Sequence, residues 1–492
     1  MSTPDSDLPQ VPSVPDESDR PRIGVDEWVS SVEGRRSAHG RLRQLAERVP
    51  SPAAYGGFIL VAALLPLMTS NGYVIRVGFD TLLYILLALG LNIVVGFAGL
   101  LDLGYVAFYG FGAYAYAMLA SPKFGLHWPT PVVMFIVVVA TMILGYLVGL
   151  PSRRLIGDYL AIVTLFFGQF FVTVVNNGER ISILGFTRGF DVTGGPNGIA
   201  DIDPFHIAGR NLESLKGYFW VALAVFAVVL ISLQFLNESR TGRAWRSLRE
   251  DPLAAEMMGM PVNRLKLAAF ALGAAVGGLT GTLFAALNTS VFATDFDVPL
   301  LITVYAMVIL GGAGSLGGVI IGAIIVNVSL EVLRTPDHAT WVFYGLVLVT
   351  LLVKLRPWKW VGIVLGGTVA LGFAVHAIVA AVWPRGTAGE SVVGGWLGNG
   401  LEHWVVLPSD PRVIANWAFV ALVTLLIALS SLSGPLQKLT LIPAIYLGAF
   451  VWENRLVVEP SITRLILLGA ILIVLMNARP QGLVGTSRVE IA

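Results

Sequence analysis

The chain has 492 residues, of which 55% are hydrophobic and 13% are charged. Soluble globular proteins carry about 25% charged residues, so this composition excludes an ordinary soluble enzyme. The 32 lysines and arginines balance 31 aspartates and glutamates, which gives no electrostatic argument for nucleic-acid binding. With no cysteine and only six scattered histidines, we expect no metal site. Composition therefore predicts an all-α polytopic membrane protein.

The first fifty residues differ from the rest of the chain. Residues 1–22 are rich in proline, aspartate and serine, and we expect a disordered tail. Residues 23–50 hold five arginines around a partly apolar face. This pattern favours an amphipathic basic helix on the anionic cytoplasmic membrane surface. A solvated basic linker is the alternative.

From Ala53 onward, apolar segments of near membrane-spanning length follow one another. The predicted spans are 54–70, 79–98, 101–120, 131–150, 158–176, 217–236, 265–287, 298–312, 315–333, 341–355, 360–383, 414–431, 439–452 and 462–478. A cytoplasmic N-terminus places most lysines and arginines on the inner side, as the positive-inside rule requires. The even number of spans then puts both termini in the cytoplasm.

Two hydrophilic loops interrupt the spans. The outer loop, 177–216, is rich in turn-forming residues, which predicts a structured cap. The inner loop, 237–266, is charged, helix-prone and longer than a simple connection between two spans needs.

The inner loop has the pattern of a docking element. Arg243, Arg246 and Arg249 recur at three-residue spacing, which places them on one helical face. Asp251 and a following proline predict the start of a short helix, and Gly259 predicts its end. Such a helix can insert into a groove of a partner. A connector packed on its own bundle is the alternative.

Several motifs resemble one family. The run LAAEMMG at 253–259 is similar to the E-A-A-x-x-x-G coupling loop of bacterial ABC importer permeases, although Leu253 stands where that pattern has glutamate. The wider chain resembles the LivM-type permease of branched-chain amino-acid ABC importers. The segments that carry this resemblance, in family order, are 88–119, 157–170, 193–199, 239–285, 308–323 and 478–485.

The resemblance defines the domain organisation that we expect. A permease core occupies 51–356, and a final helix with a cytoplasmic C-terminus occupies 461–492. Residues 357–460 do not align with the family and read as an inserted transmembrane region. We expect about ten family-core helices and about four extra ones. Contact with lipid or another subunit is the simplest role for the insertion.

The resemblance also implies the energy source and partners. This chain lacks the G-x-x-x-x-G-K-[ST] motif, so we expect no cofactor here and ATP with Mg²⁺ on two partner ATPase subunits. A second permease and an extracytoplasmic solute-binding protein complete the expected assembly in the bacterial inner membrane. The implied ATPase-coupling residues are Arg243, Arg246, Arg249, Ala254, Ala255, Glu256 and Gly259.

Glycine-rich breaks at 95–104 and 311–318 interrupt the apolar segments, as backbone that lines a cavity can. They are candidates for related halves of an internal inverted repeat. Polar residues within spans are the candidates for the pathway. They are Asn92, Asp102, Thr164, Gln169, Asn327 and Glu331. Helix capping by Asp102, interhelical hydrogen bonds by Asn92 and Gln169, and an interfacial position for Glu331 are the alternatives.

The sequence thus predicts a permease subunit that forms half of the pathway of an ATP-driven branched-chain amino-acid importer. Transport of urea or short amides by the same kind of machine is an open alternative. A self-contained secondary transporter would need a coupling acid, for which Asp102 and Glu331 are candidates. A membrane scaffold or sensor is the third possibility.

Overall fold

A computed structural model describes residues 51–151, 158–180, 191–207, 210–212, 214–355, 357–432 and 434–456, together with 463, 466, 469, 473, 482 and 483. The predicted tail at 1–22 and basic helix at 23–50 lie outside these residues. Two units are distinguished, Met1–Ala62 and Ala63–Ala492, and the division falls within the first described helix, α3 (Ser51–Met68).

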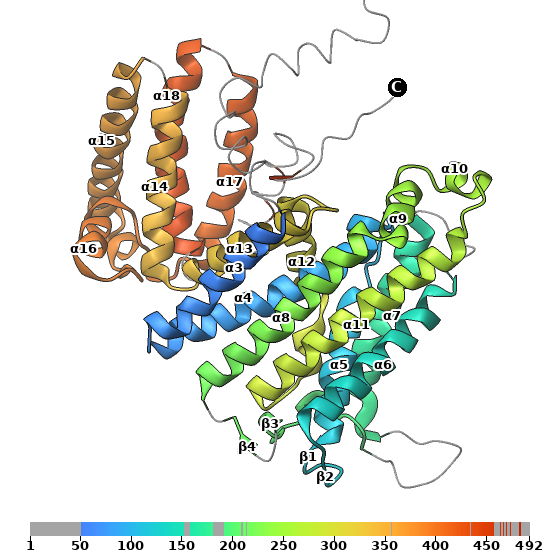
Figure 1. Ribbon diagram of the computed structural model, residues 1–492. Helices are drawn as coiled ribbons and strands as arrows, with labels where there is room; N and C mark the ends of the chain where they lie inside the picture. Colours follow the sequence, from blue (N-terminus) through green and yellow to red (C-terminus); the bar gives the residue numbers. More distant parts are fainter. Residues whose placement is uncertain are drawn as a thin grey trace, which may run out of the picture. The chain divides into compact units, whose positions relative to one another are not determined.

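Long apolar helices build the first part of the larger unit (Figure 1). They are α4 (Gly72–Asn92), α5 (Tyr105–Leu119), α6 (Thr130–Gly149), α7 (Asp158–Asn177), α8 (Leu215–Glu238), α11 (Val262–Asn288), α12 (Val298–Gly311) and α13 (Leu316–Val332). Eight helices among the described residues are long and apolar enough to cross a membrane, or up to nine if a bent pair is one span. The predicted all-α polytopic class is confirmed, and each predicted span from 54–70 to 439–452 overlaps a helix.

Helix α11 lies at the centre of this bundle and packs against α4, α5, α6 and α8. Glycines let the backbones approach closely. A Cβ at Gly112 of α5 would overlap the carbonyl oxygen of Gly278 of α11, and a Cβ at Gly281 would overlap the carbonyl oxygen of Tyr109. This close approach is the small-residue packing that membrane helices use in place of a hydrophobic driving force.

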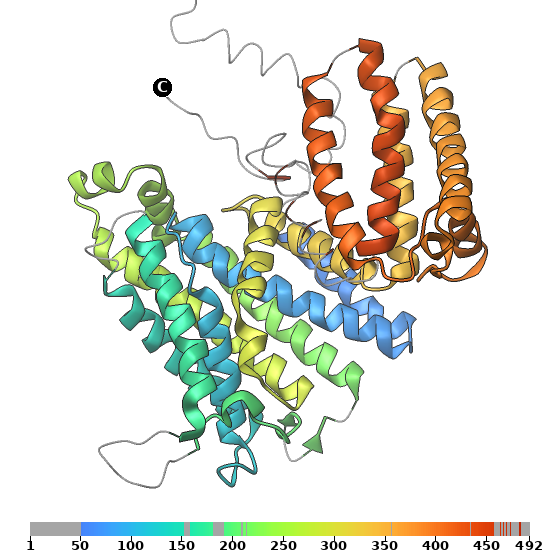
Figure 2. The same cartoon turned by 180° about the vertical axis from the view of Figure 1, so that it is seen from behind.

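The two ends of this bundle differ (Figures 1 and 2). Helices α9 (Arg240–Glu250) and α10 (Pro252–Met257) lie at one end, between α8 and α11. The hairpins β1 (Ala120–Ser121) with β2 (Leu126–His127) and β3 (His206–Ile207) with β4 (Arg210–Asn211) lie at the opposite end. In the predicted outer loop, Ile199 pairs with Val291, so its described part is structured.

The first helix of the larger bundle begins earlier than the sequence suggests. The predicted span started at residue 79, whereas α4 starts at Gly72, where the side chain of Asn71 accepts a hydrogen bond from the Tyr73 N–H. Arg76 therefore lies within the helix. At its other end α4 continues as the π-helical turn η2 (Ile93–Phe97), followed by an irregular segment that reaches α5.

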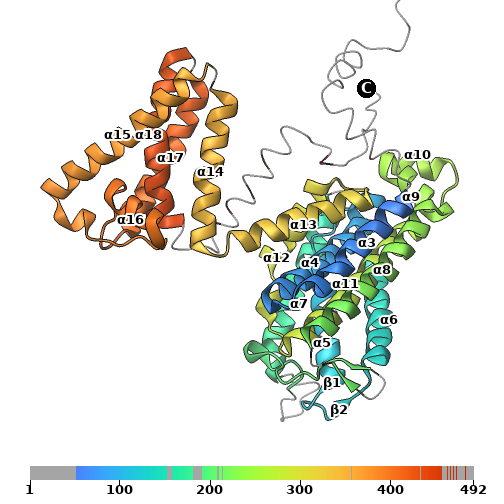
Figure 3. The same ribbon diagram turned by 60° about the vertical axis from the view of Figure 1, so that its left-hand side comes forward.

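Beyond α13 the chain bends by 115° into α14 (Pro336–Lys354). Helices α15 (Lys359–Val382), α17 (Arg412–Ser431) and α18 (Gly434–Val451) follow, with the short α16 (Gly395–Trp404) at one end of the group (Figure 3). Helix α18 packs against both α15 and α17. An apolar cluster that contains Leu351, Leu355 and Val364 joins α14 to α15. Most of the predicted last span, 462–478, lies outside the described residues.

Candidate functional site: a bridge between the inner loop and two helix breaks

The inner loop folds into two short helices with defined starts. Ser239 caps α9, where its Oγ accepts a hydrogen bond from the Gly242 N–H. Asp251 caps α10 by accepting from the N–H groups of Leu253 and Ala254, at 2.8 and 3.0 Å. Gly259 follows α10 with φ +78°, a conformation that suits glycine. The predicted Asp-Pro start and glycine stop of this helix are thus present.

Helix α9 is anchored by its apolar face. The indole of Trp245 is fully buried and donates from Nε1 to the carbonyl oxygen of Leu265 on α11, at 2.9 Å. Leu248 is also buried, and a Cβ at Gly242 would overlap the carbonyl oxygen of Leu236. These contacts hold α9 against both flanking helices, α8 and α11.

Arg249 joins this loop to both glycine-rich breaks. Its Nη1 donates to the carbonyl oxygen of Gly96 at 2.6 Å and to that of Ala313 at 3.2 Å. The breaks also bond to each other, since the Gly314 N–H donates to Oδ1 of Asn92 at 2.8 Å. Gly314 has φ +91°, and a Cβ there would overlap the Arg249 guanidinium. Arg249 thus holds three segments of the chain together.

The two breaks lie side by side, because one guanidinium reaches both. Helix α4 leads into the first break and helix α12 leads into the second. An internal inverted repeat built on these two breaks stays a prediction.

The three arginines of α9 do not share one environment. Arg243 and Arg246 are exposed, and each bonds locally: Arg243 donates to the carbonyl oxygen of Glu238 at 2.8 Å, and Arg246 to Oδ1 of Asn237 at 3.4 Å. Arg249, in contrast, is half-buried. Three-residue spacing predicts that the three arginines lie on one side of the helix. That side is wide, so Arg243 and Arg246 face solvent while Arg249 faces the bundle.

Helix α10 exposes apolar side chains. Leu253, Met257 and Met258 are 70%, 83% and 81% exposed. Of the other predicted coupling residues, Ala254, Glu256 and Gly259 are exposed, whereas Ala255 is buried. A Cβ at Gly259 would meet nothing within 4 Å. Adaptable methionines in such a position are typical of a surface that inserts into a partner.

Three predicted pathway residues lie at this same end and are fully buried. Besides Asn92, these are Asp102 and Thr164. Oδ1 of Asp102 accepts from the Gly104 N–H at 3.0 Å, just before α5, but no side chain caps the first turn of that helix. Oγ1 of Thr164 accepts from the Leu103 N–H at 2.9 Å. These groups fix the backbone of the first break, so their contacts are structural.

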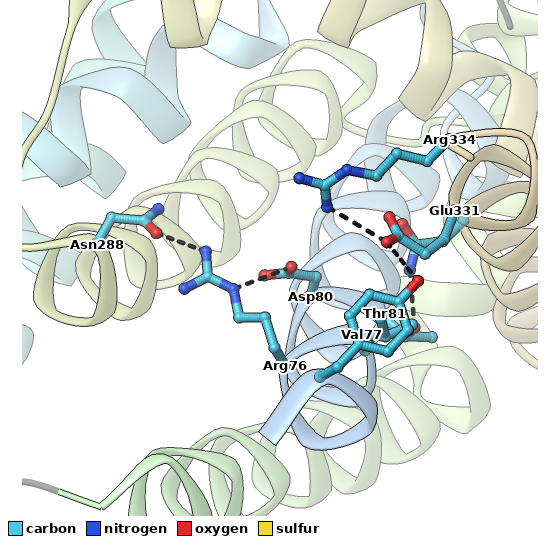
Figure 4. A network of polar contacts seen from close by, with 9 residues as sticks. Arg76, Val77, Asp80, Thr81, Asn288, Glu331 and Arg334 are labelled. Carbon is cyan, nitrogen blue, oxygen red and sulfur yellow. Dashed lines mark hydrogen bonds and ion pairs between the residues drawn. The ribbon is translucent and has the colours of Figure 1, made fainter. Parts of the chain in front are cut away.

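The remaining candidates lie elsewhere. Gln169 is exposed on α7 and donates to Oδ1 of Asp297 at 3.4 Å. Asn327 and Glu331 of α13 face α4 (Figure 4), where Nδ2 of Asn327 donates to Oγ1 of Thr81 at 2.8 Å. Oε1 of Glu331 accepts from the Tyr73 hydroxyl at 2.8 Å. The predicted pathway residues therefore do not form one site.

The sequence did not indicate Thr81 and Tyr73 of α4 as the partners of Asn327 and Glu331. Arg76 and Asp80 also lie on this helix and form an ion pair at 3.1 Å. The signal that could have found them is Asn71, an N-cap residue five positions before Arg76 that marks the true helix start. Among the described residues, no cluster of three or more histidines, aspartates or glutamates is arranged to hold a metal.

Apolar helices of membrane-spanning length and close glycine packing define a multi-pass membrane protein. The chain belongs to the family described as the branched-chain amino acid transport system permease component, whose model matches residues 73–355. The matched range ends beside the predicted start of the insertion at 357.

Individual relatives agree with this family. The chain is 36% identical over 318 residues to the high-affinity branched-chain amino acid transport system permease protein LivM of Salmonella typhimurium, covering 60% of this chain and 71% of that protein. It is 36% identical over 320 residues to LivM of Escherichia coli K12, with the same coverage. It is 24% identical over 286 residues to the permease protein LivH of Salmonella typhimurium, covering 55% of this chain and 89% of LivH. No solved structure matches significantly.

Proposed function

We propose that this chain is one permease subunit of an ATP-driven ABC importer for branched-chain amino acids. The two LivM relatives carry that transport function in their names, which supports the substrate class. The similarity to both LivM and LivH supports a second, related permease as partner. Two ATPase subunits and an extracytoplasmic binding protein complete the proposed assembly, and ATP with Mg²⁺ binds to the ATPases alone.

The observation that carries the coupling proposal is the bridge made by Arg249. Exposed Leu253, Met257 and Met258 offer a surface to an ATPase, while Arg249 bonds to both helix breaks behind that surface. Movement of residues 241–260 then shifts the ends of α4 and α12 together. The proposed orientation puts α9 and α10, together with both chain termini, in the cytoplasm of a bacterial inner membrane.

Three other functions make different predictions. A permease for urea or short amides would use the same coupling surface with another substrate. A secondary transporter would need an acid that exchanges protons with water, but Asp102 is fully buried and bonded to the start of α5. A scaffold or sensor would carry no solute at all.

Uptake measurements separate these functions. We expect vesicles that contain the full complex to accumulate labelled leucine only with ATP on the ATPase side, with or without a proton gradient. Uptake that survives ATP depletion and collapses with a protonophore would favour a secondary transporter. Uptake of urea but not leucine would identify the amide variant. Unchanged solute uptake in a deletion strain would favour the scaffold.

A further inference from the structure

A polar stripe runs along the half of α4 that lies away from the two helix breaks. Tyr73, Arg76, Asp80 and Thr81 recur at helical spacing on one side of this helix. The tyrosine is 55% exposed, and the arginine and aspartate side chains are 40% and 35% exposed. The flanking residues Ile75, Phe79, Leu82 and Leu83 are buried.

These charges lie within a membrane span. Gly72–Phe97 is long and apolar enough to cross the bilayer. With a rise of about 1.5 Å per residue, Arg76 and Asp80 lie about 6 and 12 Å along the axis from Gly72. A charged side chain deep in lipid costs about 2.5–3.5 kcal/mol or more. A half-exposed ion pair at this depth therefore faces water or protein rather than lipid.

Residues from α11 and α13 complete a charged network around the stripe (Figure 4). Arg76 donates from Nε to Asp80 at 3.1 Å and from Nη2 to Oδ1 of Asn288 at 2.6 Å. Arg334 donates to Glu331 at 3.3 Å, beside the Tyr73 hydroxyl. The two acids and two arginines form one electrostatic group, since Asp80 interacts with Arg76, Glu331 and Arg334.

The chemistry of this group matches a zwitterion. Its formal charge is zero, with two cations and two anions side by side. Within the described residues, the Arg76 bonds to Asp80 and Asn288 use two of the five N–H donors of a guanidinium. A substrate carboxylate can therefore bind Arg76 while the substrate ammonium binds a neighbouring carboxylate. An uncharged or singly charged solute would leave part of the group unmatched.

An aromatic cluster on neighbouring helices adjoins the charges through Tyr109. Tyr109 of α5 interacts electrostatically with Asp80 and Arg76. Its ring packs against Phe284 and Phe296, with centroids 5.5 and 5.2 Å away. Phe284 lies one turn before Asn288 on α11, so an apolar wall adjoins the polar group. This combination suits a molecule with a charged head and a short branched hydrocarbon tail.

We propose that Arg76, Asp80, Glu331 and Arg334 form the outer receiving site of the pathway, which holds the ammonium and carboxylate groups of the amino acid as it enters the permease. This inference rests on the proposed function and assigns the substrate contacts to particular side chains. The site lies on α4, on the end of α13 and on the turn that follows α13, far from the Arg249 bridge.

Cysteine labelling tests whether the stripe faces the aqueous pathway. The chain has no cysteine, so the unaltered protein supplies the background. In the full complex in right-side-out vesicles, we expect a membrane-impermeant thiosulfonate to label Asp80→Cys, and leucine-loaded binding protein to slow that labelling. Phe135→Cys is the matched control, because Phe135 is 70% exposed on the apolar helix α6, outside the stripe. It should label at background rate.

Charge rescue tests whether Asp80 acts through its charge. We expect Asp80→Cys to lower ATP-driven leucine uptake at least tenfold while the subunits stay assembled. A sulfonatoethyl reagent restores the negative charge and should recover part of the uptake, whereas a trimethylammonium reagent should not. Lys123→Met breaks an ion pair with Asp191 in the outer loops and should leave uptake unchanged.

Each result decides the inference. Background labelling of Asp80→Cys would overturn it, because the stripe would then face lipid or be covered by the second permease. Uptake by Asp80→Cys equal to that of the unaltered chain would overturn it while leaving the importer function intact. Absence of ATP-driven leucine uptake by the unaltered complex would overturn the proposed function, and the receiving site with it.

Discussion

The guanidinium of Arg249 on α9 donates through Nη1 to the carbonyl oxygen of Gly96, 2.6 Å away in the π-helical turn that ends α4. The same nitrogen donates to Ala313, in the turn that follows α12. A single side chain of the inner loop therefore contacts two helix ends that are more than 200 residues apart in sequence.

Loss of the Arg249 hydrogen bonds should uncouple ATP hydrolysis on the partner subunits from transport through this chain. Hydrogen bonds from a charged group contribute about 1.5–3 kcal/mol each, so Arg249→Gln removes a substantial link. We expect leucine uptake per ATP hydrolysed to fall at least tenfold while the ATPase subunits still bind. The control is Arg264→Gln, at an exposed position early in α11. An unchanged ratio in Arg249→Gln would remove the bridge from the coupling mechanism.

Gly259 tests the docking surface itself. A Cβ there meets no described residue within 4 Å, so Gly259→Asp should leave the fold and membrane insertion intact. The left-handed backbone, with φ +78°, adds modest strain. We expect the aspartate, as a new charge in the partner's groove, to reduce ATPase subunits recovered with the tagged chain at least fivefold. Gly400→Asp, in α16 with open space around its Cβ, is the control. Equal recovery from both variants would contradict docking at Gly259.

Close packing of α5 on α11 predicts a sharp size limit at Gly112. A methyl group there would overlap the backbone of Gly278, and overpacking costs about 1–3 kcal/mol. We expect Gly112→Ala to lower the Tm of the purified protein by several degrees. Gly345→Ala, on α14, has open space and should leave the Tm unchanged. Equal Tm values for both variants would show that the two backbones can separate without cost.

Glu453 should make stability depend on pH. It follows α18 in the short turn η8 (Trp452–Leu456), and burial raises the pKa of its carboxyl to about 7, although hydrogen bonds from Tyr344 and Ser391 oppose the rise. The folded state therefore holds the proton more tightly than the unfolded state, whose glutamate has a pKa of about 4.3. This stabilisation is complete below about pH 4 and is lost as the pH rises to about 7.

The matched variant for this pH effect is Glu453→Gln, which cannot ionise. We expect the Tm of the unaltered chain to fall, relative to that of the variant, between pH 5 and pH 8. Thermal unfolding of both proteins at the two pH values measures the difference. A constant difference in Tm across this range would mean that the carboxyl does not titrate there.

Much of the helical layout could be predicted from the sequence, because a bilayer requires long apolar segments. The inner loop was also recognisable, since a charged helix-forming run has no place inside lipid. Contacts were not predictable in the same way. Three-residue spacing predicted that Arg249 shares a side of α9 with Arg243 and Arg246. The spacing could not show that Arg249 faces the bundle, because that depends on how Trp245 packs α9 against α11.

The charged end of α4 shows a second limit. Arg76 interrupts the hydropathy pattern, so the predicted span began at residue 79 and omitted the first two turns of the helix. In the structure, a hydrogen bond to Asn288 of α11 offsets part of the cost of placing this arginine in the helix. Glu331 was identified from its position in a span, but its partner Tyr73 is 258 residues away and no local pattern connects them.

The most direct test of the central claim is to purify the tagged chain from its native membrane in mild detergent and to identify the proteins that accompany it. We expect two ABC ATPase subunits and a second permease of the same family in stoichiometric amounts. A chain that purifies alone, and that moves leucine into liposomes without ATP, would contradict the importer function.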